Sequence, residues 1–132
     1  MWRRVLQKRN EDTHVRDAIC AHASWTRTFS ECIDHGKLEK TSQDISCDDQ
    51  CDFGKWLAGL SPSANDPAMK KFNMIKAMHT RFHVEAGKIA VHVENGDRAS
   101  ARTGYEAPHF KRMTHSLIIN LNDWREDFRR FS

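Results

Sequence analysis

The residues with the clearest chemical potential are two histidines, His79 and His83, in the middle of a stretch that we predict to be a long helix. Residues four apart on a helix lie one turn above each other on the same face, so both imidazoles can reach one metal ion. Polar rings that face a core need partners, because burying an unpaired polar group is costly. The pair falls among apolar residues that recur at helical spacing, namely Phe72, Ile75, Phe82, Ala86, Ala90 and Val93. The pattern favours a metal site, with an ordinary core or solvated pair as the alternative.

Two further residues are candidates to complete this pair. His22 lies in the apolar stripe of the first predicted helix, where a lone histidine is more often a hydrogen-bonded core residue. Cys51 opens a short predicted helix, and the positive end of a helix dipole favours the thiolate, which is the form that binds metal. Gly54 lowers helix stability relative to alanine. We explain the glycine at this position by a close approach between the first turn of the short helix and a neighbouring helix. This approach would bring the sulfur of Cys51 near the histidines.

Together, His22, Cys51, His79 and His83 make a set of three nitrogens and one sulfur. Zn²⁺ accepts such ligands in a tetrahedron. Cu(I) would tolerate the set, whereas Mg²⁺ and Ca²⁺ prefer oxygen ligands. Four protein ligands leave no open coordination position, so we expect a structural or regulatory zinc ion and no catalytic residue.

The elements that must position these residues are helices. The segment from Arg3 to about His35 contains no proline or glycine, and Gly36 is a natural stop. The apolar stripe of this first helix comprises Ala18, Trp25, Phe29, Cys32 and Ile33. Residues 37 to 49 form a polar loop rich in Ser, Thr and Asp.

The rest of the chain continues the helical pattern. Asp48 or Asp49 would cap a short helix from residue 51 to 60, which Gly59 and Pro62 end. The remaining predicted elements are a helix that starts at Asp66-Pro67 and runs to Asn95, one or two turns over 97–103 with a break at Gly104, and a last helix from Pro108 to about Phe131. We therefore expect an all-α protein with a single domain over residues 1–132. It would be an antiparallel bundle of three long helices plus one or two short ones, with the zinc site inside the bundle.

Composition narrows the functional classes. The chain has 132 residues, of which 30% are charged, and a formal net charge of +3. Lys and Arg occur only in short runs, so we expect no nucleic-acid partner. No apolar run is long enough to cross a bilayer and the N-terminus lacks the apolar core of a signal peptide, which predicts a cytoplasmic protein without membrane insertion.

Four cysteines in such a protein are more plausibly thiols or metal ligands than a disulfide framework. Cys47 lies four residues before Cys51 and is a rival ligand, although it falls in the polar loop. Cys20 points away from the neighbouring His22 on a helix, and Cys32 is expected in the core. The other histidines, His14, His35, His92, His109 and His115, have no partner at ligand spacing.

The order of these motifs resembles that of the chemoreceptor zinc-binding (CZB) domain. It appears as His22-Ala23-Ser24-Trp25, then Cys51-Asp52-Phe53-Gly54-Lys55-Trp56-Leu57, then His79-Thr80-Arg81-Phe82-His83. The similarity covers nearly the whole chain, and the cysteine motif is its most specific part.

This resemblance implies a helical bundle with one Zn²⁺ on a His₃Cys site, usually in a homodimer. It also implies a regulatory role in bacterial signalling, notably chemotaxis and the control of diguanylate cyclases. In the cyclases zinc suppresses activity, and in chemoreceptors the zinc-bound cysteine is linked to oxidant sensing. The chain contains no Gly-Gly-Asp/Glu-Glu-Phe signature, so cyclase activity does not carry over. The effector would be a partner protein or a region outside this chain.

Two alternatives to a zinc sensor follow from the same residues. Cys51 with a histidine base could serve a thiol enzyme, and the four residues could be coincidental core positions of a plain helical interaction module. A metalloprotease is disfavoured because Thr80 stands where such a helix needs its glutamate base. A di-iron bundle is disfavoured because no Glu-x-x-His pattern lies on an apolar stripe.

Two expectations concern assembly and mechanism. Ile118 and Ile119, beside the stripe of the last helix, give the bundle more apolar surface than one core needs, which favours a symmetric homodimer through the long helices. The segment 51–60 contributes only four large apolar residues. We therefore expect loss of zinc, or oxidation of Cys51, to shift residues 37–62 without melting the bundle.

Overall fold

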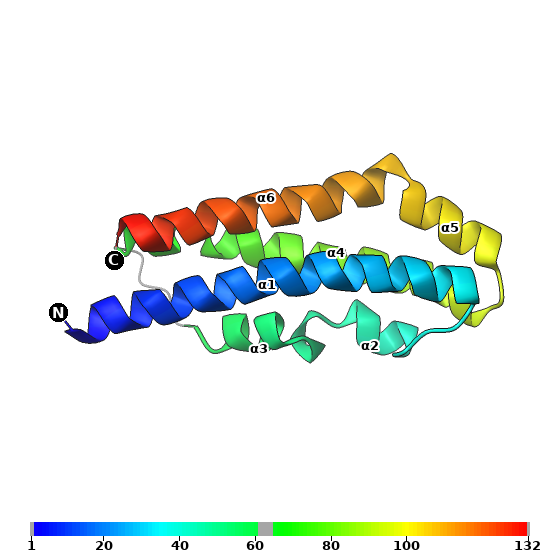
Figure 1. Ribbon diagram of the computed structural model, residues 1–132, viewed down its shortest axis with the longest axis horizontal. Helices are drawn as coiled ribbons and strands as arrows, with labels where there is room; N and C mark the ends of the chain where they lie inside the picture. The colour runs from blue at the N-terminus through cyan, green and yellow to red at the C-terminus, as the bar shows by residue number, and fades with distance from the viewer. Residues whose placement is uncertain (1, 61–64, 132) are drawn as a thin grey trace.

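Three long helices form the frame of the protein, which we describe from a computed structural model that places residues 2–60 and 65–131, with side chains from residue 10 onward (Figure 1). These are α1 (Trp2–His35), α4 (Phe72–Glu94) and α6 (Pro108–Arg130). The short elements are α2 (Ser42–Ser46), the 3₁₀ turn η1 (Asp48–Gln50), α3 (Asp52–Ala58), the 3₁₀ turn η2 (Pro67–Met69) and α5 (Arg98–Glu106). The described residues contain no strand, which confirms the predicted all-α class.

Successive layers of the bundle alternate in direction. In Figure 1, α1 and α4 run the same way, whereas α6 and the segment from α2 to α3 run the opposite way. The predicted antiparallel bundle is confirmed, with the α2–α3 segment as its fourth, broken member. Helix α1 packs mainly on α6, and α4 packs on α2, α5 and α6. The segment that carries Cys51 therefore lies along the long helices that carry the histidines.

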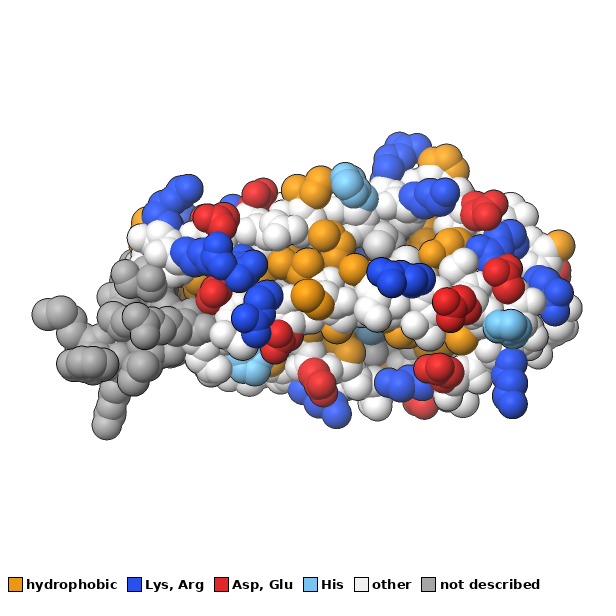
Figure 2. All heavy atoms as spheres, viewed as in Figure 1, with side chains coloured by type: hydrophobic (Ala, Val, Ile, Leu, Met, Phe, Trp, Pro, Cys, Tyr) orange, Lys and Arg blue, Asp and Glu red, His pale blue; other side chains and the backbone are white. Residues whose placement is uncertain are grey.

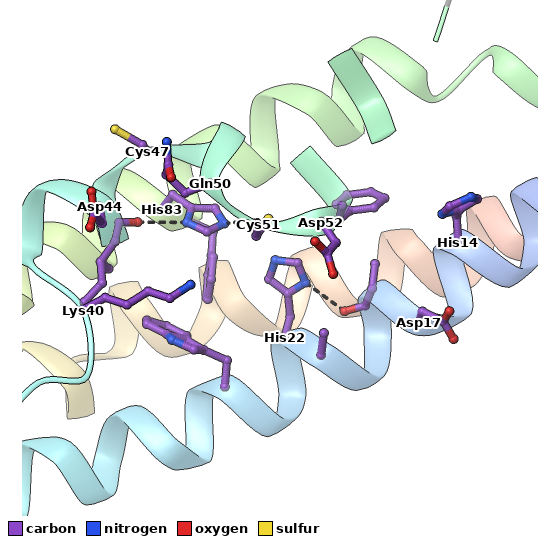
Figure 3. A pocket seen from close by; sticks show the side chains of 16 residues that line it. His14, Asp17, His22, Lys40, Asp44, Cys47, Gln50, Cys51, Asp52 and His83 are labelled. Carbon is purple, nitrogen blue, oxygen red and sulfur yellow. Dashed lines mark hydrogen bonds between the residues drawn. The ribbon is translucent and has the colours of Figure 1, made fainter. Parts of the chain in front are cut away.

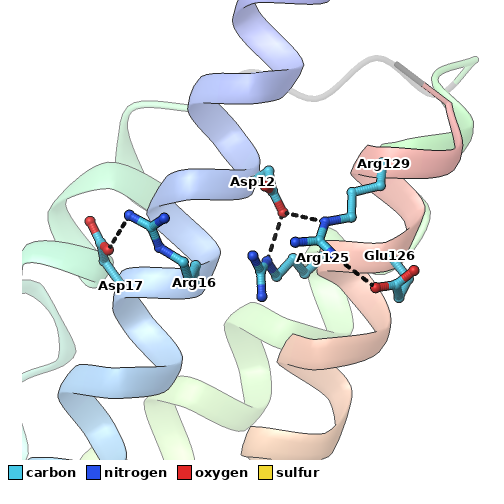
Figure 4. Close-up of polar contacts among 6 residues, drawn as sticks. All are labelled: Asp12, Arg16, Asp17, Arg125, Glu126 and Arg129. Carbon is cyan, nitrogen blue, oxygen red and sulfur yellow. Dashed lines mark hydrogen bonds and ion pairs between the residues drawn. The ribbon is translucent and has the colours of Figure 1, made fainter.

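The core between the long helices is apolar and aromatic. Its largest fully buried side chains are Trp124, Phe29, Phe82, Phe128, Ile33, Ile75, Leu117 and Leu121. Burying a side chain of this size stabilises a fold by about 1.5–3 kcal/mol. At one end of the bundle, Asp12 of α1 accepts hydrogen bonds from Arg125 (2.8 Å) and ion-pairs with Arg129 (3.4 Å) of α6 (Figure 4). The largest fully buried apolar side chains thus all come from the long helices, and α3 adds Phe53 and Leu57 to the same core.

Helix α4 starts later than the predicted start at Asp66-Pro67. Asp66 does act as a cap, accepting a hydrogen bond from the amide of Ala68 (3.0 Å), but the first turn is the 3₁₀ turn η2 and α4 begins only at Phe72. The reason is a competing donor: the indole of Trp124 donates to the carbonyl of Ala68 (2.6 Å). That carbonyl would otherwise accept from the amide of Phe72 in a continuous α-helix.

Two further boundaries correct the sequence-based expectations. The predicted polar loop contains α2, whose first turn is capped by the hydroxyl of Thr41 accepting from the amide of Asp44 (3.1 Å). Helix α5 continues past Gly104 to Glu106 and stops before Pro108, because the residue before proline is pushed out of the helical region. A side chain at Gly104 would come within 3.1 Å of Ile89, so this glycine serves close packing on α4. Pro62 lies outside the described residues.

The surface is charged and mixed. On the face seen in Figure 2, basic and acidic side chains are interspersed, and no basic stripe of the kind that tracks a phosphate backbone is seen there. Among the described helices, none is long and apolar enough to span a membrane.

Candidate metal centre

Three elements bring the four predicted residues to one point inside the bundle. His79 and His83 lie one turn apart on α4, His22 lies on α1, and Cys51 immediately precedes α3. Within the described part of the chain, these four form the group of potential metal ligands, with one ligand atom from each within 4.8 Å of the others. His79 is 1% exposed and His22 is 5% exposed, whereas Cys51 and His83 are half-buried.

Four of the six distances between the donor atoms are close to the edges of a tetrahedral zinc site. The Nε2 atom of His79 lies 3.2 Å from that of His22 and 3.0 Å from that of His83. The sulfur of Cys51 lies 3.3 Å from Nε2 of His79 and 3.6 Å from Nε2 of His83. A tetrahedral zinc ion with ordinary bond lengths would place its nitrogen ligands about 3.3 Å apart and its sulfur about 3.6 Å from each nitrogen. The four residues therefore fit a zinc ion with little rearrangement.

The hydrogen bonds of the imidazoles fix which nitrogen faces the centre. Nδ1 of His22 lies 2.8 Å from the carbonyl of Ala18, and Nδ1 of His83 lies 2.9 Å from the carbonyl of Ile45 (Figure 3). A carbonyl only accepts, so both Nδ1 atoms carry the proton and both Nε2 atoms point a lone pair inward. Carbonyl partners of this kind orient the ligands in many zinc sites. Nδ1 of His79 is buried without a hydrogen-bond partner among the described residues.

Burial keeps the three imidazoles neutral. It lowers the pKa of His22 to about 4 and that of His79 to about 2, and it also lowers the pKa of His83; the neighbouring imidazoles contribute to the first two shifts. Neutral imidazole is the form that binds metal. All three rings are thus in the form that binds metal at neutral pH. The Nε2 atoms of His22 and His83 carry no proton, so His79 is the one imidazole of the three whose Nε2 could carry a proton toward the others. A cation at the centre would satisfy all of them.

The electrostatics of Cys51 differ from the sequence-based expectation. Its sulfur does cap α3, accepting a hydrogen bond from the amide of Gly54 (3.4 Å), so neither Asp48 nor Asp49 is the cap. However, burial raises the pKa of the Cys51 thiol by more than the backbone amides of Gly54 and Phe53 lower it. The helix N-terminus is therefore insufficient to hold a thiolate here. A cation beside the sulfur would supply the missing stabilisation.

The glycine of the cysteine motif is explained by a contact that differs from the predicted one. A Cβ atom at Gly54 would lie 1.6 Å from the carbonyl oxygen of Asp48. The close approach is therefore to η1, the turn just before Cys51, and not to a long helix. Only glycine lets this turn fold back on α3, and that fold sets where the sulfur of Cys51 lies.

The same turn is anchored on the histidine helix by residues that the sequence analysis did not select. The hydroxyl of Thr80, on the α4 turn between the two histidines, donates to the carboxylate of Asp48 and lies 3.0 Å from the carbonyl of Lys76. This hydrogen bond ties the cysteine turn to the ligand helix without using the metal. The available signal was the position of Thr80 itself, between two predicted ligands and on the same helix.

Helix α2 is held on α4 more tightly than expected. A Cβ atom at Gly87 would lie 2.5 Å from Cβ of Ser46, so the two backbones meet where α4 has no side chain. At the far end of α2, the amide of Ser42 donates to the carboxylate of Glu94 (2.8 Å), and so does its hydroxyl. Within residues 37–62, which we expected to shift on loss of zinc, α2 is therefore held on α4 by contacts that do not involve the metal.

A cavity of about 580 Å³ opens beside the cluster. Its lining includes the three ligand candidates His22, Cys51 and His83, together with Lys40 and Cys47 (Figure 3). Aromatic side chains of Trp25, Phe53 and Phe82 form much of its apolar wall. Small solutes can therefore reach the sulfur and two of the imidazoles from solution, whereas His79 does not line the cavity.

The remaining cysteines and histidines lie outside the cluster. Cys47 is half-buried and does not join the four, Cys32 is half-buried, and Cys20 is exposed. His14 stacks on Trp56 with ring centroids 4.8 Å apart. His92 is exposed.

We expect Thr80→Val to weaken zinc binding, because it removes the hydroxyl that ties η1 to α4 while keeping the side-chain volume. Loss of an outer contact of this kind costs roughly tenfold in metal affinity. Competition with a chromophoric chelator measures the dissociation constant. Thr80→Ser, which keeps the hydroxyl, is the matched control and should bind as the wild type does. Equal affinity of Thr80→Val and wild type would show that this hydrogen bond does not position Cys51.

Comparison with known proteins bears on the nature of this centre. The family model described as the chemoreceptor zinc-binding domain matches residues 22–90, which is more than half of the chain and spans all four residues of the cluster. The comparisons with curated proteins and with solved structures each found no match. The family match and the His₃Cys cluster together identify zinc as the cofactor. The chain belongs to the chemoreceptor zinc-binding domain family and is a zinc-binding signalling domain.

Proposed function

We propose that His22, Cys51, His79 and His83 hold one zinc ion and that residues 1–132 act as one sensor unit of a bacterial signalling system. The observation that carries this proposal is the convergence of three imidazole nitrogens and one half-buried sulfur within 4.8 Å of one another, with four of their distances near those of a tetrahedral zinc site. When bound, zinc supplies the positive charge that keeps Cys51 as a thiolate. The chain's own residues then hold the geometry, through the carbonyls of Ala18 and Ile45 behind two of the rings.

A regulatory role fits this centre better than catalysis. Four protein ligands would close the coordination shell and leave no position for a substrate. A thiol enzyme would need a Cys51 thiolate beside an imidazolium, as in other Cys–His pairs. Burial raises the pKa of Cys51 and lowers the pKa of His79 and His83, so both partners favour their neutral forms. The sulfur–nitrogen distances alone therefore do not support an enzyme.

The proposed output is the position of α3. His22, His79 and His83 stand on long helices with a shared core, whereas Cys51 is the N-cap of a seven-residue helix. Loss of the sulfur ligand would free η1 and α3 from the histidines. The close packing of α2 at Gly87 leads us to narrow the responsive region from the predicted 37–62 to about 47–60.

The proposed signal is either the level of zinc or an oxidant that reaches the sulfur. The cavity beside the cluster supports access of a small oxidant to Cys51. The controlled effector would be a cyclase, a chemoreceptor or another signalling partner in the cytoplasm. The surface around α3 is the part of the domain that such an effector would recognise.

We further propose that the domain works as a symmetric homodimer. Of the two isoleucines that motivated this expectation, Ile118 is half-buried and Ile119 is 45% exposed, so Ile119 does not fill the core. Exposed large apolar residues also occur on α4, at Met74, Val84 and Val91. Such residues on long helices are suited to an interface between two copies.

We expect purified protein to carry about one zinc ion per chain, and we expect His79→Ala to lose most of it because a tetrahedral site cannot spare a central ligand. Elemental analysis after extensive dialysis measures the stoichiometry. Cys47→Ser and His92→Ala remove residues of the same types outside the cluster and should retain the metal. A zinc content in His79→Ala equal to that of these controls would contradict the ligand assignment.

Hydrogen exchange of zinc-bound and metal-free protein tests the proposed output. Amide protection should fall in residues 47–60 when zinc is removed and should persist in α1, α4 and α6, because their core does not include the metal. Cys51→Ser with zinc present should resemble the metal-free protein over the same residues. Uniform loss of amide protection across all helices would show that zinc stabilises the whole fold and does not control the position of α3 alone.

Analytical ultracentrifugation tests the dimer. The wild type should sediment as a dimer at tens of micromolar, and Ile119→Lys should shift it toward monomer by placing a charge in the apolar contact. Circular dichroism of the variant confirms that the bundle is intact. A wild-type monomer at these concentrations would overturn the proposed assembly.

A further inference from the structure

Cys47 and Cys51 stand at the two ends of the same 3₁₀ turn. Cys47 precedes η1 and Cys51 follows it, and both have extended backbone conformations. The other two cysteines, Cys20 and Cys32, lie on α1. Cys47 is therefore the thiol that the chain places next to the proposed zinc ligand, although it belongs to no part of the ligand cluster.

Both cysteines border the same space. Cys47 and Cys51 are half-buried and line the cavity of about 580 Å³ that opens beside the metal centre. A small solute that reaches the sulfur of Cys51 through this cavity is also close to Cys47. The cavity thus provides one entry route for an oxidant and places a second thiol beside it.

The two side chains do not face each other in the folded state. Figure 3 shows the sulfur of Cys47 directed away from Cys51, whose sulfur points toward the histidines. A disulfide needs Cα atoms roughly 4.4–6.8 Å apart and Cβ atoms that point toward each other. The turn η1 must therefore rearrange before the two sulfurs can meet, so a bond between them is incompatible with Cys51 in the His₃Cys cluster.

The turn that keeps them apart is weakly held from within. Its closing backbone hydrogen bond, from the amide of Gln50 to the carbonyl of Cys47, is long at 3.4 Å. The firmer restraints come from outside the turn: the Thr80 hydroxyl on Asp48, and the contact of the Cys51 sulfur with the histidines. Once the sulfur leaves the histidines, η1 loses one of these restraints. The Thr80–Asp48 hydrogen bond and the packing of Asp48 on Gly54 are the contacts that must then give way for the turn to unwind.

From this arrangement we infer that Cys47 is the resolving thiol of Cys51, and that the two form a reversible disulfide that excludes the zinc-bound state. The inference rests on the proposed zinc site. A hydroperoxide first oxidises the Cys51 thiolate: the O–O bond breaks, an S–O bond forms, and Cys51 becomes a sulfenic acid while the peroxide is reduced to hydroxide or alkoxide. The Cys47 thiolate then attacks the Cys51 sulfur. The S–S bond forms, the S–O bond breaks, and the departing hydroxide takes up the proton that the Cys47 thiol released when it ionised, which gives water.

The consequence is protection of the sensor against irreversible damage. Without a resolving thiol, the sulfenic acid of Cys51 can be oxidised further to sulfinic acid, which thiol reductants do not reverse. With Cys47 at the other end of the turn, the product is a disulfide that a reductant returns to two thiols. Zinc can then bind again.

The test treats the zinc-loaded protein with hydrogen peroxide, alkylates the remaining thiols, and examines the tryptic peptide 41–55, which contains both cysteines. Cys47→Ser is the informative variant and Cys20→Ser is the matched control. In the wild type and the control, the peptide should be lighter by two hydrogen atoms and carry no alkyl group. Dithiothreitol should restore both thiols and full zinc binding. In Cys47→Ser, zinc should be lost equally, but Cys51 should appear as sulfinic acid and zinc binding should not recover.

Recovery of zinc binding by Cys47→Ser as complete as that of the wild type would overturn the inference. So would a disulfide that joins peptide 41–55 to a peptide of α1, or oxidant-driven zinc release without the loss of two hydrogen atoms. These results would leave the proposed zinc site intact. Failure of the untreated protein to bind zinc would instead contradict the proposed function, on which the inference depends.

Discussion

The constraint on which the structure depends is that four electron-pair donors meet at one buried point. Three imidazoles direct lone pairs there because backbone carbonyls hold two of their opposite nitrogens and burial keeps all three neutral. The fourth donor is a thiol whose ionisation is disfavoured by the same burial. A cation at this point would neutralise the repulsion between lone pairs that no shared proton bridges. Four of the six distances between the donor atoms are 3.0–3.6 Å and all six are within 4.8 Å, which is close to the spacing of ligands around a tetrahedral cation.

The four donors are carried by elements that differ in how firmly they are packed, and this difference is what would let the domain act as a switch. Two of the long helices contribute the histidines and share a continuous apolar core with the third. The cysteine stands beside a single turn and a short helix, held by the Thr80–Asp48 contact and by the tight fold at Gly54. Energy from metal binding can therefore act on the position of one small element, because the rest of the bundle is stable through its own packing.

Much of this arrangement could be predicted from the sequence, because it is encoded in spacing and periodicity. The His79/His83 pair on an apolar stripe, the helix stop at Gly36, and the proline at the start of α6 are local signals, and the structure agrees with them. What the sequence could not provide were contacts between distant residues. The indole of Trp124 takes the carbonyl of Ala68 and delays the start of α4, and Gly87 meets Ser46 of a helix that was predicted to be loop. The effect of burial on the Cys51 thiol also depends on tertiary packing, and it reversed the expectation drawn from the helix dipole.

X-ray absorption at the zinc edge of the metal-loaded protein tests the central claim most directly, because it reports the atoms bound to the ion. The account predicts a four-coordinate ion with nitrogen at about 2.0–2.1 Å and one sulfur at about 2.3 Å. In Cys51→Ser the sulfur contribution should disappear, whereas in Cys47→Ser it should remain. A six-coordinate shell dominated by oxygen, or a shell without sulfur in the wild-type protein, would contradict it.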